Sequence, residues 1–314
     1  MKIKLILFFT YLIIVSINSI AQDYSEYYEG INNAKLALIN ADLEQAEDCY
    51  YQTFEDFDFV YARDCYNALE ISTKLKHFDK INYFMKRCIK QGVEFAYLER
   101  QEMMSDYKKT TLYSEFLLNK DSLRNIYESK INWGIRNEII EMFTKDQMIR
   151  KRYYKAILFK RRKIGRDWEA LNKMQVERLI EITKKHGFPG EKLIGIDAKK
   201  MHHKINDFDL SAGMPIIIFI HHYSQPNESY NSILKPEIKK GNLWNEHYAI
   251  ISDFQYTYGK QKYGLIPCYS LRFKPKESKE QIDRNRLEIG LLSWSNTKKL
   301  ESRKYLTPFW IRLR

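Results

Sequence analysis

The sequence has few of the residues that break helices. Its 314 residues include only 12 glycines and 7 prolines. Because a many-turned β fold needs such residues at its turns, their shortage favours a mainly α protein. With 44% hydrophobic and 29% charged residues, the chain can bury a real core, which excludes a disordered protein by composition.

Common catalytic and metal-binding signatures are also missing. The four cysteines include no Cys-x-x-Cys pair, which excludes a zinc ribbon and a thioredoxin-like site. There is no His-Glu-x-x-His, no Gly-x-Ser-x-Gly and no phosphate-binding glycine loop. We therefore predict no cofactor and no metal, and no motif assigns a reaction.

Long apolar runs are confined to the N-terminus. Beyond residue 21 no stretch of about 18 unbroken apolar residues occurs, so no transmembrane segment is predicted there. Residues 1–21 have the parts of a signal peptide: Lys2 and Lys4, the apolar run Leu5–Val15, and small residues Ser19 and Ala21 before a cleavage point. We expect export to the periplasm, the cell surface or the medium.

Acidic residues are outnumbered, and the net charge is +12. An exported protein this basic is expected to meet anionic lipid headgroups, polysaccharide or cell-wall polymers rather than nucleic acid. Nine of the seventeen residues from Arg150 to Arg166 are Lys or Arg, with no acid between them. The predicted anion-binding residues are Lys160, Arg161, Arg162 and Lys163. The alternative is the solvated face of an amphipathic helix.

Residues 22–130 show a repeated pattern of paired helices. Leu43 and Ala46 align with Phe78 and Ile81 at a shift of 35 residues. Paired helices at this period resemble the tetratricopeptide family over about residues 26–92. The resemblance implies helical hairpins whose concave face takes a protein or peptide partner.

Cys65 and Cys88 lie at similar distances from a turn expected at Lys76–His77. They could face each other across a helical hairpin and form a disulfide. The alternative is a pair of small buried thiols packed side by side.

Residues 131–314 are expected to form a helical domain with a small β hairpin around Pro267. The apolar run Met214–Ile220 fits either a buried strand or a buried helix, and periodicity does not choose between them.

A series of short motifs marks this half of the chain. In order they are Asp146-Gln147-x-x-Arg150, His-Gly-Phe-Pro-Gly at 186–190, His221-His222, Gly241 followed by Tyr248-Ala249-x-x-x-Asp253, Gln261-x-Tyr263-Gly264, and Arg286-x-x-x-Gly290-Leu291. The ordered set resembles an uncharacterised bacterial domain-of-unknown-function family. The resemblance implies a domain that occurs in the same chain as tetratricopeptide-like helices, and it implies no particular reaction. The chain departs from the family pattern after Asp253 and after Gly264, where polar residues are missing.

Four residues are candidates for catalysis. His222 ends an apolar run, where packing could hold it as a general base or, alternatively, as a metal ligand, with Asp253 as the group that orients it. Arg150 and Arg286 could bind a carboxylate or phosphate. The predicted ligand-binding residues are Gln147, Glu246, Tyr248 and Tyr263. The alternative for all of these is a packed histidine and ordinary ion pairs.

Two functions follow from these patterns. The first is an exported interaction or scaffold module that binds a protein or the cell envelope. The second is a cell-envelope hydrolase that uses the His/Asp/Arg set.

Overall fold

The computed structural model describes residues 22–196, 211–224, 229–258, 266–271 and 276–303. The N-terminal half contains α2 (Tyr24–Ile39), α3 (Leu43–Asp56), α4 (Ala62–Leu75), α5 (Phe78–Lys90), α6 (Phe95–Glu99), the 3₁₀ turns Glu102–Met104 and Tyr107–Lys109, and α7 (Thr111–Lys130). The C-terminal half contains α8 (Trp133–Lys155), α9 (Leu158–His186), α10 (Glu191–Ile194), the 3₁₀ turn Ser211–Gly213, α11 (Met214–Tyr223), α12 (Asn231–Lys239), α13 (Asn245–Tyr258), α14 (Lys279–Glu288) and α15 (Trp294–Arg303). The prediction of a mainly α protein is confirmed.

The described residues contain no strand. Residues 266–271, which include Pro267 of the predicted β hairpin, are irregular, and the rest of that segment lies outside the described residues. The predicted signal peptide, residues 1–21, also lies outside them. Among the helices described, none is long and apolar enough to cross a membrane.

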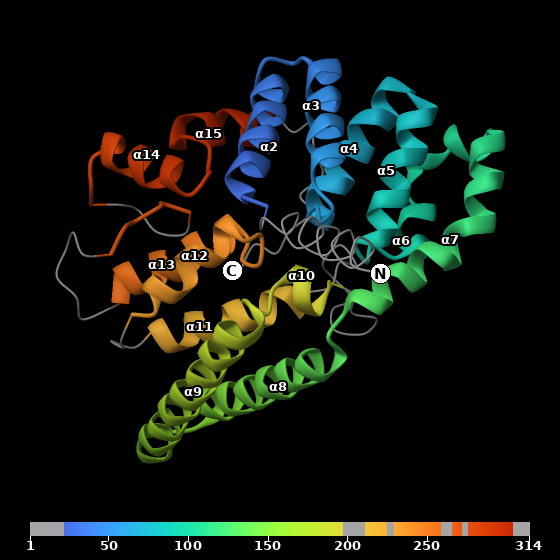
Figure 1. Cartoon of the computed structure of the whole chain (residues 1–314). Helices are drawn as coiled ribbons and strands as arrows, with labels where there is room; N and C mark the ends of the chain where they lie inside the picture. Colours follow the sequence, from blue (N-terminus) through green and yellow to red (C-terminus); the bar gives the residue numbers. More distant parts are fainter. Residues whose placement is uncertain (1–21, 197–210, 225–228, 259–265, 272–275, 304–314) are drawn as a thin grey trace, which may run out of the picture.

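The N-terminal helices pack one after another in a curved array (Figure 1). Asp42 caps α3 by accepting a hydrogen bond from the backbone N–H of Gln45 at 2.9 Å. Lys76, in the left-handed conformation, ends α4 at the expected turn. The shift of 35 residues carries the first residue of α3 onto the first residue of α5. The tetratricopeptide-like packing itself stays a prediction.

One hydrophobic core runs through both halves. The helix α2 packs against α12 and α15, and the Tyr61 hydroxyl donates to the carbonyl of Gly241 at 3.1 Å. Gly241 and Gly290 have positive φ, and a Cβ on either would lie under 3 Å from the side chain of Tyr24 or Tyr28. Only glycine fits both conditions, so these two turns let the C-terminal half approach α2 closely.

The apolar run at 214–220 is the helix α11, which settles the alternative between strand and helix. Pro215 stands in its first turn, where a missing N–H costs nothing. Its neighbours α8, α9 and α13 surround it. A helix that is apolar on nearly all sides is stable in such a buried position.

The helices α8 and α9 form a long hairpin that projects from the body of the molecule (Figure 1). Asn132 caps α8 by accepting from the N–H of Ile135 at 3.0 Å. The chain reverses at Ala156–Ile157, and α9 ends at Gly187, whose φ is 86°. The base of the hairpin packs against α11.

Candidate functional site

Two of the predicted catalytic residues hold the irregular segment 266–271. The Asp253 carboxylate accepts the backbone N–H groups of Tyr269 at 2.7 Å and Leu271 at 2.8 Å. Arg286 donates to the carbonyl of Tyr269 at 2.6 Å, to the carbonyl of Leu292 at 2.7 Å and to the Thr297 hydroxyl at 2.7 Å. Both side chains are buried. Their hydrogen bonds give them a structural role on this segment.

The other two predicted catalytic residues lie on different elements. His222 is buried in α11, with its ring against the rings of Tyr223 and Tyr230 at 5.1 and 6.1 Å. Burial lowers the pKa of His222 to about 4, which keeps the imidazole neutral. Arg150 is exposed on α8. In α11 the neighbouring histidine, His221, contacts a carboxylate.

His221 and Asp146 form that pair. The His221 Nδ1 lies 2.7 and 2.9 Å from the two Asp146 carboxylate oxygens. Asp146 is fully buried, and it also accepts from the Trp168 indole N–H at 2.9 Å and the Gln147 amide at 2.8 Å. The His221 side chain keeps 13% of its surface exposed. With Nδ1 directed at the carboxylate, Nε2 of a neutral ring is the nitrogen able to accept a proton.

This pair joins two of the motifs that the sequence marked. Asp146 and Gln147 come from α8, and His221 comes from α11. The Arg150 guanidinium donates to the Gln147 amide oxygen at 3.5 Å, so Arg150 lies beside the pair. Adjacent residues of a helix point in directions about 100° apart, so only one of the two histidines can face α8.

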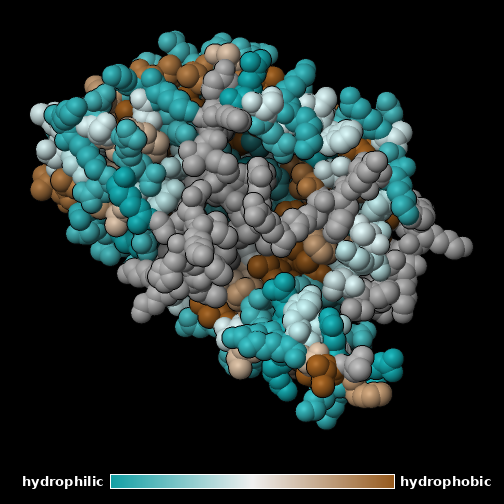
Figure 2. Space-filling view, turned by 180° about the vertical axis from the view of Figure 1, so that it is seen from behind, coloured by the Kyte–Doolittle hydropathy of each residue, from teal (hydrophilic) through white to brown (hydrophobic). Residues whose placement is uncertain are grey.

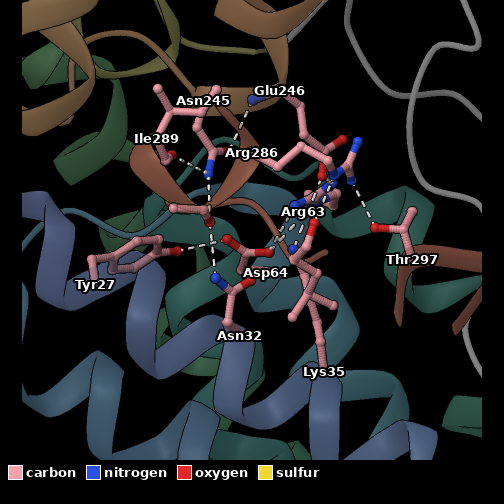
Figure 3. Close-up of polar contacts among 12 residues, drawn as sticks. Tyr27, Asn32, Lys35, Arg63, Asp64, Asn245, Glu246, Arg286, Ile289 and Thr297 are labelled. Atoms are coloured by element: carbon pink, nitrogen blue, oxygen red, sulfur yellow. Dashed lines mark hydrogen bonds and ion pairs between the residues drawn. The ribbon is translucent and has the colours of Figure 1, made fainter. Parts of the chain in front are cut away.

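A second polar cluster joins the two halves of the molecule (Figure 3). The Arg63 guanidinium of α4 donates to the Glu246 carboxylate of α13 at 3.0 Å, and it stacks 3.8 Å above the Trp244 ring. The Asp64 carboxylate accepts from the Tyr27 hydroxyl at 2.8 Å. Beside Glu246, the pKa of the Lys35 ammonium is lowered by burial and by the charge of Arg63.

Hydrogen bonds to the α14–α15 turn extend this cluster. The Asn32 amide donates to the Gly290 carbonyl at 2.9 Å, and the Asn245 amide donates to the carbonyls of Ile289 and Gly290 at 3.1 and 3.0 Å (Figure 3). The sequence predicts Glu246 as a ligand-binding residue. In the structure its carboxylate accepts a hydrogen bond from Arg63. It holds the halves together.

A cavity of about 760 Å³ lies between α2, α12 and α14. Its walls are mixed in character, with amides and charges beside apolar surface: Glu29, Asn32, Asn33, Asn231, Lys235, Tyr248, Pro267 and Glu288 are among the lining residues. Tyr248, also predicted to bind a ligand, contributes to this wall and packs on Tyr269 at 5.9 Å. Tyr263 lies outside the described residues.

The basic segment forms the end of the α8–α9 hairpin, and we call residues 148–166 the hairpin tip. All nine of its Lys and Arg side chains are exposed: Arg150, Lys151, Arg152, Lys155, Lys160, Arg161, Arg162, Lys163 and Arg166. Large apolar side chains are exposed among them, namely Met148, Tyr154, Ile157 and Phe159. In Figure 2 hydrophobic residues stand among hydrophilic ones at this projecting end.

The four cysteines are free thiols in the structure. Cys65 and Cys88 are buried, and burial together with a hydrogen bond between their side chains raises the pKa of the Cys65 thiol. The two residues therefore lie side by side across the α4–α5 hairpin. Among the described residues, no group of three or more His, Cys, Asp or Glu side chains could hold a metal ion.

Compared with protein-family models, curated proteins and solved structures, the chain matches none. Five residues of these two clusters were not among the predicted site residues: Asp146 and His221 of the first, and Lys35, Arg63 and Asp64 of the second. Arg63 and Asp64 stand in the first turn of α4, whose residues 62–72 are all buried, and this burial is visible only in the structure. Charged residues within a helix that is buried on all sides must find partners, and these find them across the junction.

Proposed function

We propose that the protein is an exported interaction module. Its hairpin tip binds an anionic surface of the cell envelope. The observation that carries the proposal is the composition of the tip. Nine exposed cations, no acid and four exposed large apolar side chains gather within residues 148–166. A helix face that only contacts water needs no such apolar side chains.

Electrostatic attraction supplies the affinity in this proposal. Each Lys or Arg close to an anionic membrane surface contributes about 1 kcal/mol, and this attraction falls off within a Debye length. No Asp or Glu lies between residues 147 and 166 to cancel the field. Binding should therefore weaken steeply as the salt concentration rises.

The remaining helices serve as the scaffold. The cavity between α2, α12 and α14 offers amides, charges and apolar surface to a protein or peptide partner. Lys235 and Glu288, 2.6 Å apart, line this cavity from opposite helices. The tetratricopeptide resemblance of residues 26–92 supports the same role.

The test is binding of the mature chain to vesicles with and without anionic lipid and to isolated envelope material. We expect retention on both anionic targets, no retention on neutral vesicles, and loss of retention when Lys160, Arg161, Arg162 and Lys163 are all changed to Gln. Equal binding by this variant and the wild type would contradict the proposal.

A second function, hydrolysis of envelope material, is favoured by the Asp146–His221 pair. Held by Asp146 at 2.7 Å, the His221 ring could take a proton from water through Nε2 as the water attacks a carbonyl carbon or phosphorus, and then return the proton to the leaving group. Arg150, beside Gln147, would bind the negative charge of the substrate.

This activity is tested with His221→Gln and Asp146→Asn on envelope material, with release of soluble fragments as the measurement. Both changes should abolish release, while His222→Gln serves as the neighbouring control and should retain it. Release that survives His221→Gln would overturn the hydrolase, and circular dichroism of each variant checks that the fold persists.

A further inference from the structure

We infer that the apex of the hairpin tip inserts its apolar side chains into a lipid bilayer. This inference rests on the proposed function, and it names the partner as lipid rather than polysaccharide or cell-wall polymer. It is carried by the placement of apolar residues relative to the cations.

The exposed apolar side chains lie where the chain reverses. Ile157 is the N-cap of α9, Phe159 stands in its first turn, and their exposed fractions are 77% and 83%. Tyr154, in the last turn of α8, is 60% exposed. Exposed apolar side chains that gather at one point mark an interaction site more often than scattered ones do.

The hairpin carries this apex away from the body of the molecule. Asp146 and Trp168, near the tip end of the hairpin, contact His221 of α11. Ala156 lies ten positions after Asp146, so the tip extends about 15 Å beyond that contact at 1.5 Å per residue. The apex can therefore reach a flat surface before the rest of the protein meets it.

Contacts within the tip hold it in shape. The Tyr153 ring packs on Trp168 at 5.5 Å, and the Arg161 guanidinium lies over Tyr153 at 4.6 Å. A Cβ on Gly165 would lie 3.3 Å from the Tyr153 ring, so the small residue allows α9 to approach closely. A tip that is already ordered loses little conformational entropy on binding.

The arrangement of charge and apolar surface matches the layers of an anionic bilayer. Ile157 and Phe159 would enter the boundary between headgroups and acyl chains, and long Lys and Arg side chains on both helices would extend to the phosphates. Tyr154 suits the interface, where aromatic residues with a polar end gather. A hydrated polysaccharide offers the cations a partner but gives Ile157 and Phe159 no apolar phase to enter.

The experiment uses the mature chain with Phe159→Trp, and a matched control with Leu118→Trp on α7. Leu118 is 85% exposed, so both new indoles begin in water. Each variant is mixed with anionic vesicles whose acyl chains carry bromine, and the fluorescence of the existing tryptophans is subtracted with the wild type. Only an indole within the acyl region is quenched.

We expect quenching and a blue shift for Phe159→Trp, neither for Leu118→Trp, and no blue shift when a soluble polyanion replaces the vesicles. Changing Ile157 and Phe159 together to Ser should weaken vesicle affinity by about tenfold or more and leave polyanion affinity unchanged. Leu118→Ser should change neither.

Two results would overturn the inference, and they differ. If vesicles bind but the new indole at 159 stays unquenched, binding is electrostatic alone: the proposed function stands and insertion fails. If neither vesicles nor the polyanion bind, the proposed function fails together with the inference.

Discussion

Arg63 and Glu246 form an ion pair at 3.0 Å although 183 positions separate them in the chain. Both side chains are nearly enclosed, and the Arg63 guanidinium also covers the Trp244 ring. Because Arg63 comes from α4 and Glu246 from α13, the pair fixes how the N-terminal and C-terminal halves meet.

Removing both members of this pair should cost less than the sum of the two single removals. Arg63→Met leaves the Glu246 carboxylate buried without its nearest cation, and we expect a loss of about 3–5 kcal/mol in the free energy of unfolding. The double variant Arg63→Met with Glu246→Met should lose less than the sum of the single changes. Chemical denaturation of the three variants measures this coupling.

The exposed pair Lys298–Glu301, at 2.9 Å, is the control for that measurement. We expect breaking it to cost at most about 1 kcal/mol. Similar losses for the two pairs would show that Arg63 and Glu246 do not hold the halves together.

Glu191 should make the protein less stable as the pH rises. Burial raises the pKa of this carboxyl to about 8, an effect that the nearby Asp64 charge increases. In the unfolded chain the pKa is near 4.5. A raised carboxyl pKa means that the folded state holds the proton more tightly, so stability is lost between pH 4.5 and 8.

The change Glu191→Gln should remove this loss of stability. The Ala62 N–H donates a hydrogen bond to the Glu191 carboxyl at 2.5 Å, and the glutamine amide oxygen can still accept it. Relative to the wild type, the variant should gain stability on going from pH 5 to pH 8.5, by at most about 1.4 kcal/mol per pH unit. Unfolding midpoints that stay parallel across this range would refute a protonated Glu191.

His222 should have the opposite effect and make the protein less stable as the pH falls. Burial lowers its pKa to about 4 in the folded protein, against about 6.5 in the unfolded chain. Its contribution to stability is therefore complete above pH 6.5 and is lost as the pH falls to 4. His222→Phe should flatten the fall in unfolding midpoint over this range, and an unchanged slope would contradict the assignment.

The cysteines give a prediction about covalent structure. Because Cys65 and Cys88 are buried neighbours and free in the structure, all four thiols should react with a thiol reagent after denaturation without reductant. Two reactive thiols in place of four would indicate that Cys65 and Cys88 are joined as a disulfide in the protein as isolated.

Helix positions were predictable where local signals agree. Three predicted helix ends agree with the structure: the start of α3 at Asp42, the turn after α4 at Lys76–His77 and the end of α9 at Gly187. Such ends are predictable because capping depends on neighbouring residues alone. The run 214–220 was ambiguous, since isoleucine fits a strand and only burial by α8, α9 and α13 favours a helix.

The site was harder to predict because it depends on contacts between distant segments. Asp146 and His221 were both within marked motifs, but the direction of each side chain decides which histidine meets the carboxylate. The sequence predicts Asp253 as the partner of His222 because a carboxylate and an imidazole are chemically suited to act together. It accepts two backbone N–H groups instead, and nothing local in the sequence indicates that use.

The most direct test of binding through the hairpin tip compares two variants with the same loss of charge. One changes Lys160, Arg161, Arg162 and Lys163 to Gln; the other changes Lys108, Lys109, Lys184 and Lys185, which are exposed elsewhere, two of them at the far end of α9. Affinity for anionic vesicles at low salt should fall about a hundredfold or more for the tip variant and within a few-fold for the control. Equal losses would show that net charge alone drives binding and would contradict a role for the tip.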